Sequence, residues 1–163
     1  MSILQSYDYV LFDGAFGTYY SKKYHSEQPC ELACIEHPKR VLEIHREYIE
    51  AGAMAIKTNT FAANTISLKK DFSSVREIIT QAWKLANQAT DNKKVFVFAD
   101  IGPIFTEDNS IDELYKIADL FLSLGAKHFL LETAQDDSVF HLAEYVKKKL
   151  PDAFVITSFA VDQ

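Results

Sequence analysis

Two acidic residues in this sequence each follow directly after a short apolar run. Asp13 follows residues 10–12, and Glu132 follows residues 129–131. In parallel α/β proteins, ligands bind beyond the carboxyl ends of the strands, so both acids are expected at one rim of a sheet. An acid in such a place is partly buried and needs a cation or a proton beside it. Two acids at one rim would suit a ligand that carries an ammonium group.

Each acid also has a purely structural interpretation. Asp13 stands in an Asp-Gly pair, which is common turn chemistry, so it could simply cap the turn after the strand. Glu132 could form an internal ion pair with Lys57, which lies in another apolar run. Gly14 and Gly17 free the backbone amides after Asp13 to approach a ligand, and such amides suit a carboxylate. Acids for an amine and amides for a carboxylate outline an amino-acid site.

The elements that must position these residues follow from a regular alternation. Short apolar runs alternate with amphipathic stretches, which is typical of repeated βα units around a parallel sheet. Strands buried on both faces are predicted at residues 9–12, 55–58, 95–99, 128–132 and 154–160. Helices are predicted from Pro38 to Gly52 and along the apolar faces at residues 75–86, 114–122 and 139–146.

Five strands do not close a (β/α)8 TIM barrel, which typically needs about 250 residues. No linker or composition shift marks a domain boundary within residues 1–163. The fold class expected is therefore α/β, the N-terminal part of a (β/α)8 barrel with about five strands. The remainder of the barrel is expected to lie outside this chain.

Composition narrows the class of partner. The 163 residues are 48% hydrophobic, enough for a core, and carry a formal net charge of -6, which disfavours nucleic acid. No segment has the pattern of a signal peptide or the length of a membrane span, so a cytoplasmic protein without a membrane partner is expected. Cys30 and Cys34 lie near His25 and His37, but the spacing fits no specific zinc motif.

Several ordered motifs resemble the homocysteine S-methyltransferase domain. That domain occurs in the N-terminal part of cobalamin-dependent methionine synthases, in betaine-homocysteine methyltransferases and in bacterial fusions with methylenetetrahydrofolate reductase. The resemblance covers essentially the whole chain. The matching stretches are residues 13–18 (DGAFGT), 37–38 (HP), 44–52 (IHREYIEAG), 58–61 (TNTF) with Asn64, 101–103 (IGP) and 130–133 (LLET).

The resemblance implies transfer of a methyl group to the sulfur of L-homocysteine, giving methionine. Asp13 and Glu132 match the family acids that hold the homocysteine amino group, and residues 14–18 match the part near its carboxylate. Residues 58–60 would help to shape the pocket. The residues expected to bind the substrate are thus Asp13, Gly14, Ala15, Phe16, Gly17, Thr18, Asn59, Thr60 and Glu132.

The chemistry further requires a thiolate, because a free thiol with a pKa of about 8.5 is mostly protonated at neutral pH. In the family, three cysteine thiolates bind zinc, and the metal ionises the substrate thiol. Cys30 and Cys34 do not match those ligands, which are expected beyond Gln163. We therefore expect no catalytic residue and no metal ligand in this chain, and no turnover by it alone. The methyl donor stays open among methylcobalamin, a methylfolate, betaine and S-methylmethionine.

The sequence departs from the family pattern at two positions. Lys57 stands where the family more often has an acid, and Asp100 stands where a small residue is usual.

Three other functions are possible. A haloacid dehalogenase-type phosphatase also has an aspartate after its first strand, but it requires a second acid where Ala15 stands. The chain could instead be a non-catalytic half-barrel that self-associates through open strand edges. A pterin-binding (β/α) barrel methyltransferase shares the fold pattern but explains the paired acids less well.

Overall fold

Four parallel strands pair in chain order, β1-β2-β3-β4. The computed structural model describes residues 7–91, 93–104, 111–135 and 137–160. The strands are β1 (Ala55–Lys57), β2 (Phe96–Ile101), β3 (His128–Ala134) and β4 (Phe154–Phe159). In register, Ile56 faces Val97, Asp100 faces Leu130, and Leu130 faces Ile156. A sheet whose strand order never reverses is wound in one direction, as in a (β/α) barrel.

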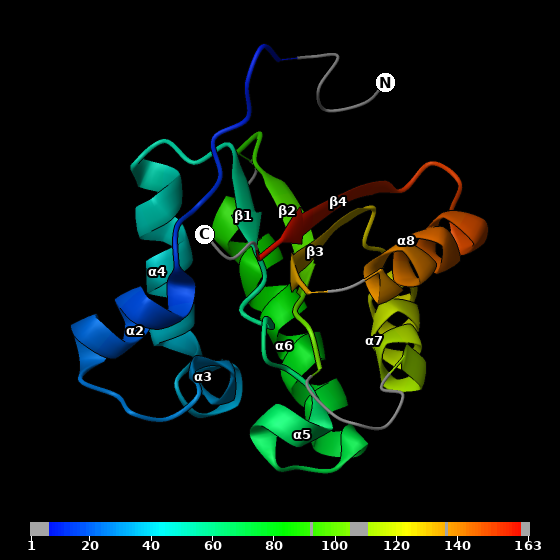
Figure 1. The fold of residues 1–163 in the computed structure, drawn as a ribbon. Helices are drawn as coiled ribbons and strands as arrows, with labels where there is room; N and C mark the ends of the chain where they lie inside the picture. Colours follow the sequence, from blue (N-terminus) through cyan, green and yellow to red (C-terminus); the bar gives the residue numbers. More distant parts are fainter. Residues whose placement is uncertain (1–6, 92, 105–110, 136, 161–163) are drawn as a thin grey trace.

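Helices connect the strands and pack against one another in the same order. These are α4 (Pro38–Glu50), α6 (Phe72–Thr90), α7 (Ile111–Ser123) and α8 (Ser138–Lys149). The pairs α4–α6, α6–α7 and α7–α8 are in contact, so the helices form one layer along the sheet (Figure 1). The chain therefore has an α/β fold and forms part of a TIM barrel, as predicted.

The four predicted helices are confirmed, and the sequence signals at their ends have the expected roles. Pro38 occupies the first turn of α4, where its missing N–H costs no hydrogen bond. Gly52 follows α4 with a φ of 105°, a conformation that favours glycine. Asp71 caps α6 by accepting a hydrogen bond from the Ser74 backbone N–H at 2.8 Å. The apolar faces of all four helices are buried against the sheet.

The first predicted strand, residues 9–12, forms only a single parallel bridge between Phe12 and Ala55. The backbone of this segment still lies along β1, because Asp13 donates to the Ala55 carbonyl at 3.0 Å and Ala55 donates to that of Leu11 at 3.1 Å. Tyr9 is 72% exposed and Leu11 51% exposed. With one paired edge and little burial among the described residues, the segment does not build a full ladder.

Three short helices were not predicted: α2 (Phe16–Tyr24), α3 (Ala33–Glu36) and α5 (Thr65–Leu68), with a 3-10 turn η1 (Cys30–Leu32) before α3. In Figure 1, α3 and α5 lie below the strands and α2 lies to their lower left. They belong to the segments that follow residue 13 and β1. Most of the candidate site is built from these segments.

The sheet has apolar side chains on both faces. One face packs against the helices, and the other carries a smaller cluster of Ala55, Phe98 and Leu130 with Phe12 and Phe154 against it. The expected burial of both faces holds for β2, whereas β4 is half-buried and ends at the exposed Phe159. Among the described residues no further strand covers β4. None of the described helices has the length and apolar character needed to cross a membrane.

Candidate functional site

A cavity of about 320 Å³ opens at the carboxyl ends of β1, β2 and β3, beside the first turn of α2. It is lined by Ala15, Phe16, Gly17, Thr18, Cys30, Glu31, Lys57, Thr58, Asn59, Thr60, Phe61, Asp100, Glu132 and Thr133. Seven of the predicted substrate-binding residues are among them: Ala15, Phe16, Gly17, Thr18, Asn59, Thr60 and Glu132. Segments far apart in the sequence thus meet at one rim.

Asp13 and Gly14, the other two predicted residues, lie beside this cavity. The Asp13 Oδ2 atom accepts a hydrogen bond from the backbone N–H of Lys57 at 3.0 Å, while its Oδ1 atom is buried without a partner. Gly14 packs under Tyr48, whose hydroxyl would lie 3.0 Å from a Cβ placed at Gly14. Asp13 therefore joins the first segment to β1 and keeps one oxygen uncommitted.

Residues 14–18 are not the open glycine loop that was expected. Phe16, Gly17 and Thr18 form the first turn of α2, and no side chain caps that turn in the described structure. The first amides of a helix have no partner within it, and the helix dipole is positive there. The backbone amides predicted for a carboxylate are therefore supplied by a helix N-terminus.

Lys57 and Glu132 form an ion pair at the cavity wall. The Lys57 Nζ atom lies 3.0 Å from Oε1 and 3.3 Å from Oε2 of Glu132. Their side chains are 14% and 25% exposed. The internal ion pair considered from the sequence is thus present, and it places a cation where a ligand ammonium group was expected.

Asp100 is a third acid of this cluster, and it was absent from the predicted site. It ends an apolar run at the same rim as Asp13 and Glu132, which is the signal that could have identified it. Its side chain is buried, and its Oδ1 atom has no hydrogen-bond partner. Its backbone is held by Thr58 and Thr60, whose hydroxyls lie 3.0 Å from the Asp100 N and 2.7 Å from its carbonyl oxygen.

Burial and mutual repulsion perturb the cluster's protonation. Burial is the main cause that raises the pKa of Asp13 to about 7, against the opposing hydrogen bond from Lys57. Burial and then the charge of Glu132 raise the pKa of Asp100 well above its ordinary value. Burial alone would lower the pKa of Lys57, but Asp100, Glu132 and Asp13 outweigh it and raise that pKa. The lysine is therefore charged, while the neutral forms of Asp13 and Asp100 are more populated than those of exposed aspartates.

The two cysteines pack around Asn59 beside the cavity. The Cys30 thiol donates to Asn59 Oδ1 at 3.0 Å, and the Asn59 side-chain amide donates to the Cys30 carbonyl at 2.7 Å. Burial raises the pKa of Cys34 to about 12 and also raises the pKa of Cys30. Both thiols are therefore protonated, and Cys30 helps to hold Asn59 in place at the cavity wall.

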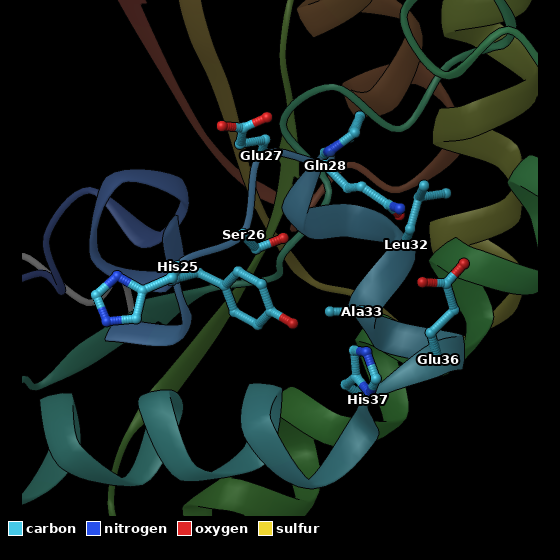
Figure 2. A pocket seen from close by; sticks show the side chains of 10 residues that line it. His25, Ser26, Glu27, Gln28, Leu32, Ala33, Glu36 and His37 are labelled. Carbon is cyan, nitrogen blue, oxygen red and sulfur yellow. The ribbon is translucent and has the colours of Figure 1, made fainter. Parts of the chain in front are cut away.

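His25 and His37 do not join the cysteines. They line a second cavity of about 420 Å³ between the end of α2 and the start of α4 (Figure 2). In Figure 2 the His25 ring lies apart from the side chains of Glu36 and His37. Within the described ranges, no three His, Cys, Asp or Glu side chains form a group that could hold a metal ion.

Comparison with known proteins gives three consistent results. The sequence profile of the homocysteine S-methyltransferase family matches residues 10–163. Methionine synthase of Mycobacterium tuberculosis (strain ATCC 25618 / H37Rv) is 32% identical over 146 residues, which cover 76% of this chain and 12% of that protein.

Among solved structures, the metallated form of the homocysteine methyltransferase MmuM from Escherichia coli has a TM-score of 0.80 at 19% identity, covering 99% of this chain and 66% of that one. The apo form has a TM-score of 0.76 at 22% identity, covering 99% and 63%. These structures share the fold. The chain spans somewhat under two thirds of their length.

Proposed function

We propose that this chain, which belongs to the homocysteine S-methyltransferase family, forms the substrate-binding part of an enzyme that methylates the sulfur of L-homocysteine to give methionine. The observation that carries the proposal is the cavity at the strand ends. It brings Glu132 and Asp100 together with the uncapped first turn of α2. Acids on one side and free helix amides on the other match the two charged groups of an α-amino acid.

In this arrangement the ammonium group of homocysteine faces Glu132 and Asp13, and its carboxylate faces the first turn of α2. A charged hydrogen bond from the ammonium group would satisfy the free Asp13 oxygen, which is buried without a partner. Asn59 and Thr60 then form the wall between these two ends. The thiol of the substrate is left to point along the cavity.

The resemblance implies zinc as the group that ionises this thiol, as a Lewis acid does when a thiol binds to it. The described residues do not fit such a centre, because no three of their His, Cys, Asp or Glu side chains form a group that could hold a metal ion, and Cys30 and Cys34 pack around Asn59 instead. We infer that the metal-binding cysteines follow Gln163 in a longer parent enzyme. This chain would then bind and orient the substrate without turning it over.

The proposal is tested by isothermal calorimetry with L-homocysteine. We expect weak binding to the chain and a loss of binding in the double variant Asp13→Asn, Glu132→Gln, because the changes remove both carboxyl groups that face the ammonium group. Asp119→Asn is the matched control, since Asp119 is an exposed acid on α7 that pairs with Lys149 away from the cavity. Equal homocysteine affinity for the chain and the double variant would contradict the assignment.

The same titration with a methylfolate separates the competing enzyme class. Tight methylfolate binding that is equal in the unaltered chain and in the double variant would favour a pterin-binding barrel. The methyl donor of the parent enzyme is a separate question, with methylcobalamin, a methylfolate, betaine and S-methylmethionine as candidates. Activity assays with each donor on the longer parent enzyme would identify it.

A non-catalytic half-barrel is the second candidate, favoured by the half-buried β4 with Phe159 and Phe140 exposed beside it. The rings of these two phenylalanines pack at 5.6 Å and form a small apolar surface next to the strand edge. This candidate predicts a stable complex through β4 in place of homocysteine binding.

A further inference from the structure

Lys57 holds a position that the proposed substrate needs. It is the last residue of β1, and its Nζ atom contacts both carboxylate oxygens of Glu132 at 3.0 and 3.3 Å. Both residues line the cavity. An ammonium group that approaches Glu132 from the cavity therefore meets an ammonium group that is already there.

We propose that Lys57 is a specificity-determining residue that competes with the ammonium group of an amino-acid ligand for Glu132. This inference rests on the proposed function and deepens it. In this chain the acid cluster is neutralised from within, so a ligand must displace the Lys57 side chain before its own ammonium group can bind. Ligand affinity therefore depends on the difference in free energy between two similar ion pairs, the one that Glu132 forms with Lys57 and the one it forms with the ligand ammonium group.

Displacement is sterically possible without unfolding the site. The Lys57 side chain is partly exposed at the wall of an open cavity, and its four-carbon stem is flexible. The hydrogen bond to Asp13 comes from the backbone N–H of Lys57, so it persists when the side chain moves. The Lys57 ammonium group can thus move into solvent while β1 and Asp13 keep their positions.

The charges around Lys57 predict how protons respond. Asp13, Asp100 and Glu132 face it from residue 13, β2 and β3, and the Tyr48 hydroxyl on α4 lies near Asp13. Exchange of one ammonium group for another leaves the cluster charge unchanged. Lys57 lowers the pKa values of Asp13 and Asp100, so without it these two carboxyl groups would retain an extra proton, which a bound ammonium group would expel.

The test compares four variants with the unaltered chain by calorimetry with L-homocysteine. Lys57→Met and Lys57→Gln remove the competing charge at similar side-chain length, and Gln can still donate a hydrogen bond to Glu132 if Met does not fold. Lys57→Arg keeps the charge. Lys149→Met removes a lysine that pairs with Asp119 on the exposed surface of the helix layer. Thermal unfolding establishes that each variant is folded.

We expect the neutral variants to bind homocysteine on the order of tenfold more tightly than the unaltered chain, because the ligand ammonium group then supplies Glu132 with the cation that Lys57 no longer provides. Lys57→Arg and Lys149→Met should stay at the unaltered affinity. Titrations in buffers of different ionisation enthalpy should give about one more proton released per homocysteine in the neutral variants. 4-Mercaptobutanoate, which lacks the ammonium group, should gain nothing from the loss of Lys57.

Two negative outcomes have different meanings. If the chain binds homocysteine and needs Glu132, but neither neutral variant binds more tightly, the competition is wrong and the proposed function stands. If folded Lys57→Met and Lys57→Gln both fail to bind homocysteine, the competition and the ammonium site are both wrong. A gain for 4-mercaptobutanoate equal to that for homocysteine would also overturn the proposal, since the gain would then owe nothing to the ammonium group.

Discussion

At the scale of single residues, several buried polar groups of this protein have no hydrogen-bond partner. The described structure leaves one oxygen of Asp13, one oxygen of Asp100 and both ring nitrogens of His45 buried without a hydrogen bond. Unsatisfied buried groups cost stability, so they call for an explanation. The two acids border the cavity, where a ligand would satisfy them. His45 packs against the Phe16 ring at 5.0 Å under the first turn of α2.

The burial of His45 is expected to lower the free energy of unfolding at acidic pH. Burial lowers the pKa of its imidazole from 6.5 to about 3. The unfolded chain then binds more protons than the folded chain between these values, so this contribution is complete above pH 6.5 and falls as pH drops toward 3. The cost by pH 4.5 is about 3 kcal/mol, since two pH units below 6.5 contribute about 1.4 kcal/mol each. His45→Phe should remove that slope in urea unfolding measured from pH 7 to 4.5.

Asp13 has the opposite effect on the pH dependence of folding stability. Its pKa is raised from 3.8 to about 7, so its contribution is present below pH 3.8 and is lost as pH rises toward 7. The quantity to compare is therefore the difference between the unaltered chain and His45→Phe at each pH. A difference that does not change with pH would contradict the assignment to His45.

At the scale of elements, the loop after β1 and the end of β2 are locked together by a close backbone approach. Gly102 donates its N–H to the Phe61 carbonyl at 3.2 Å, and a Cβ placed at Gly102 would lie 2.8 Å from the Phe61 ring. Phe61 and its neighbours Asn59 and Thr60 line the cavity. The shape of this wall therefore depends on the absence of a side chain at residue 102.

Gly102→Ala should displace Phe61 and lower the free energy of unfolding by about 1–3 kcal/mol, as overpacking does. The same variant should weaken any ligand of the cavity. Gly17→Ala is the matched control for stability, because its new Cβ would meet only the Cys30 sulfur at 3.4 Å within a helix turn. Alanine there should be neutral or slightly stabilising. Equal stability of both variants in urea unfolding would show that the approach at Gly102 is not tight.

At the scale of the whole molecule, the sheet is covered unevenly. Helices α4, α6, α7 and α8 bury one face, while β4 remains half-buried at the edge of the sheet. A half-covered parallel strand with exposed phenylalanines favours pairing with another strand. If the chain self-associates through an open strand edge, as considered from the sequence, the contact should lie at β4 with Phe140 and Phe159.

Sedimentation velocity over a range of concentrations tests whether this association occurs. Phe159→Glu should shift the chain toward monomer, because a charge cannot be buried in an apolar contact without cost. Ile66→Glu on α5 is the matched control, since Ile66 is also an exposed apolar residue but lies away from β4. Equal shifts by both variants would mean that the association does not use β4.

The sequence by itself was sufficient to predict the parallel α/β order, the four long helices and the shared rim of Asp13 and Glu132. These features follow from periodicity and from acids at the ends of apolar runs, which are local signals. Family motifs placed Asn59 and Thr60 at the same cavity. Local patterns did not predict α2, because its first turn begins within a segment that contains two glycines and lacks a capping side chain.

Only the tertiary structure decided which cation neutralises the acids. Lys57 and Glu132 are 75 residues apart, and whether their side chains meet depends on the register of β1, β2 and β3. Packing between distant segments likewise decides that Asp100 is buried and that the His45 ring nitrogens have no hydrogen-bond partner. It also decides that the first predicted strand forms only one bridge. Long-range geometry therefore set the electrostatics of the site, while local sequence set the elements that carry it.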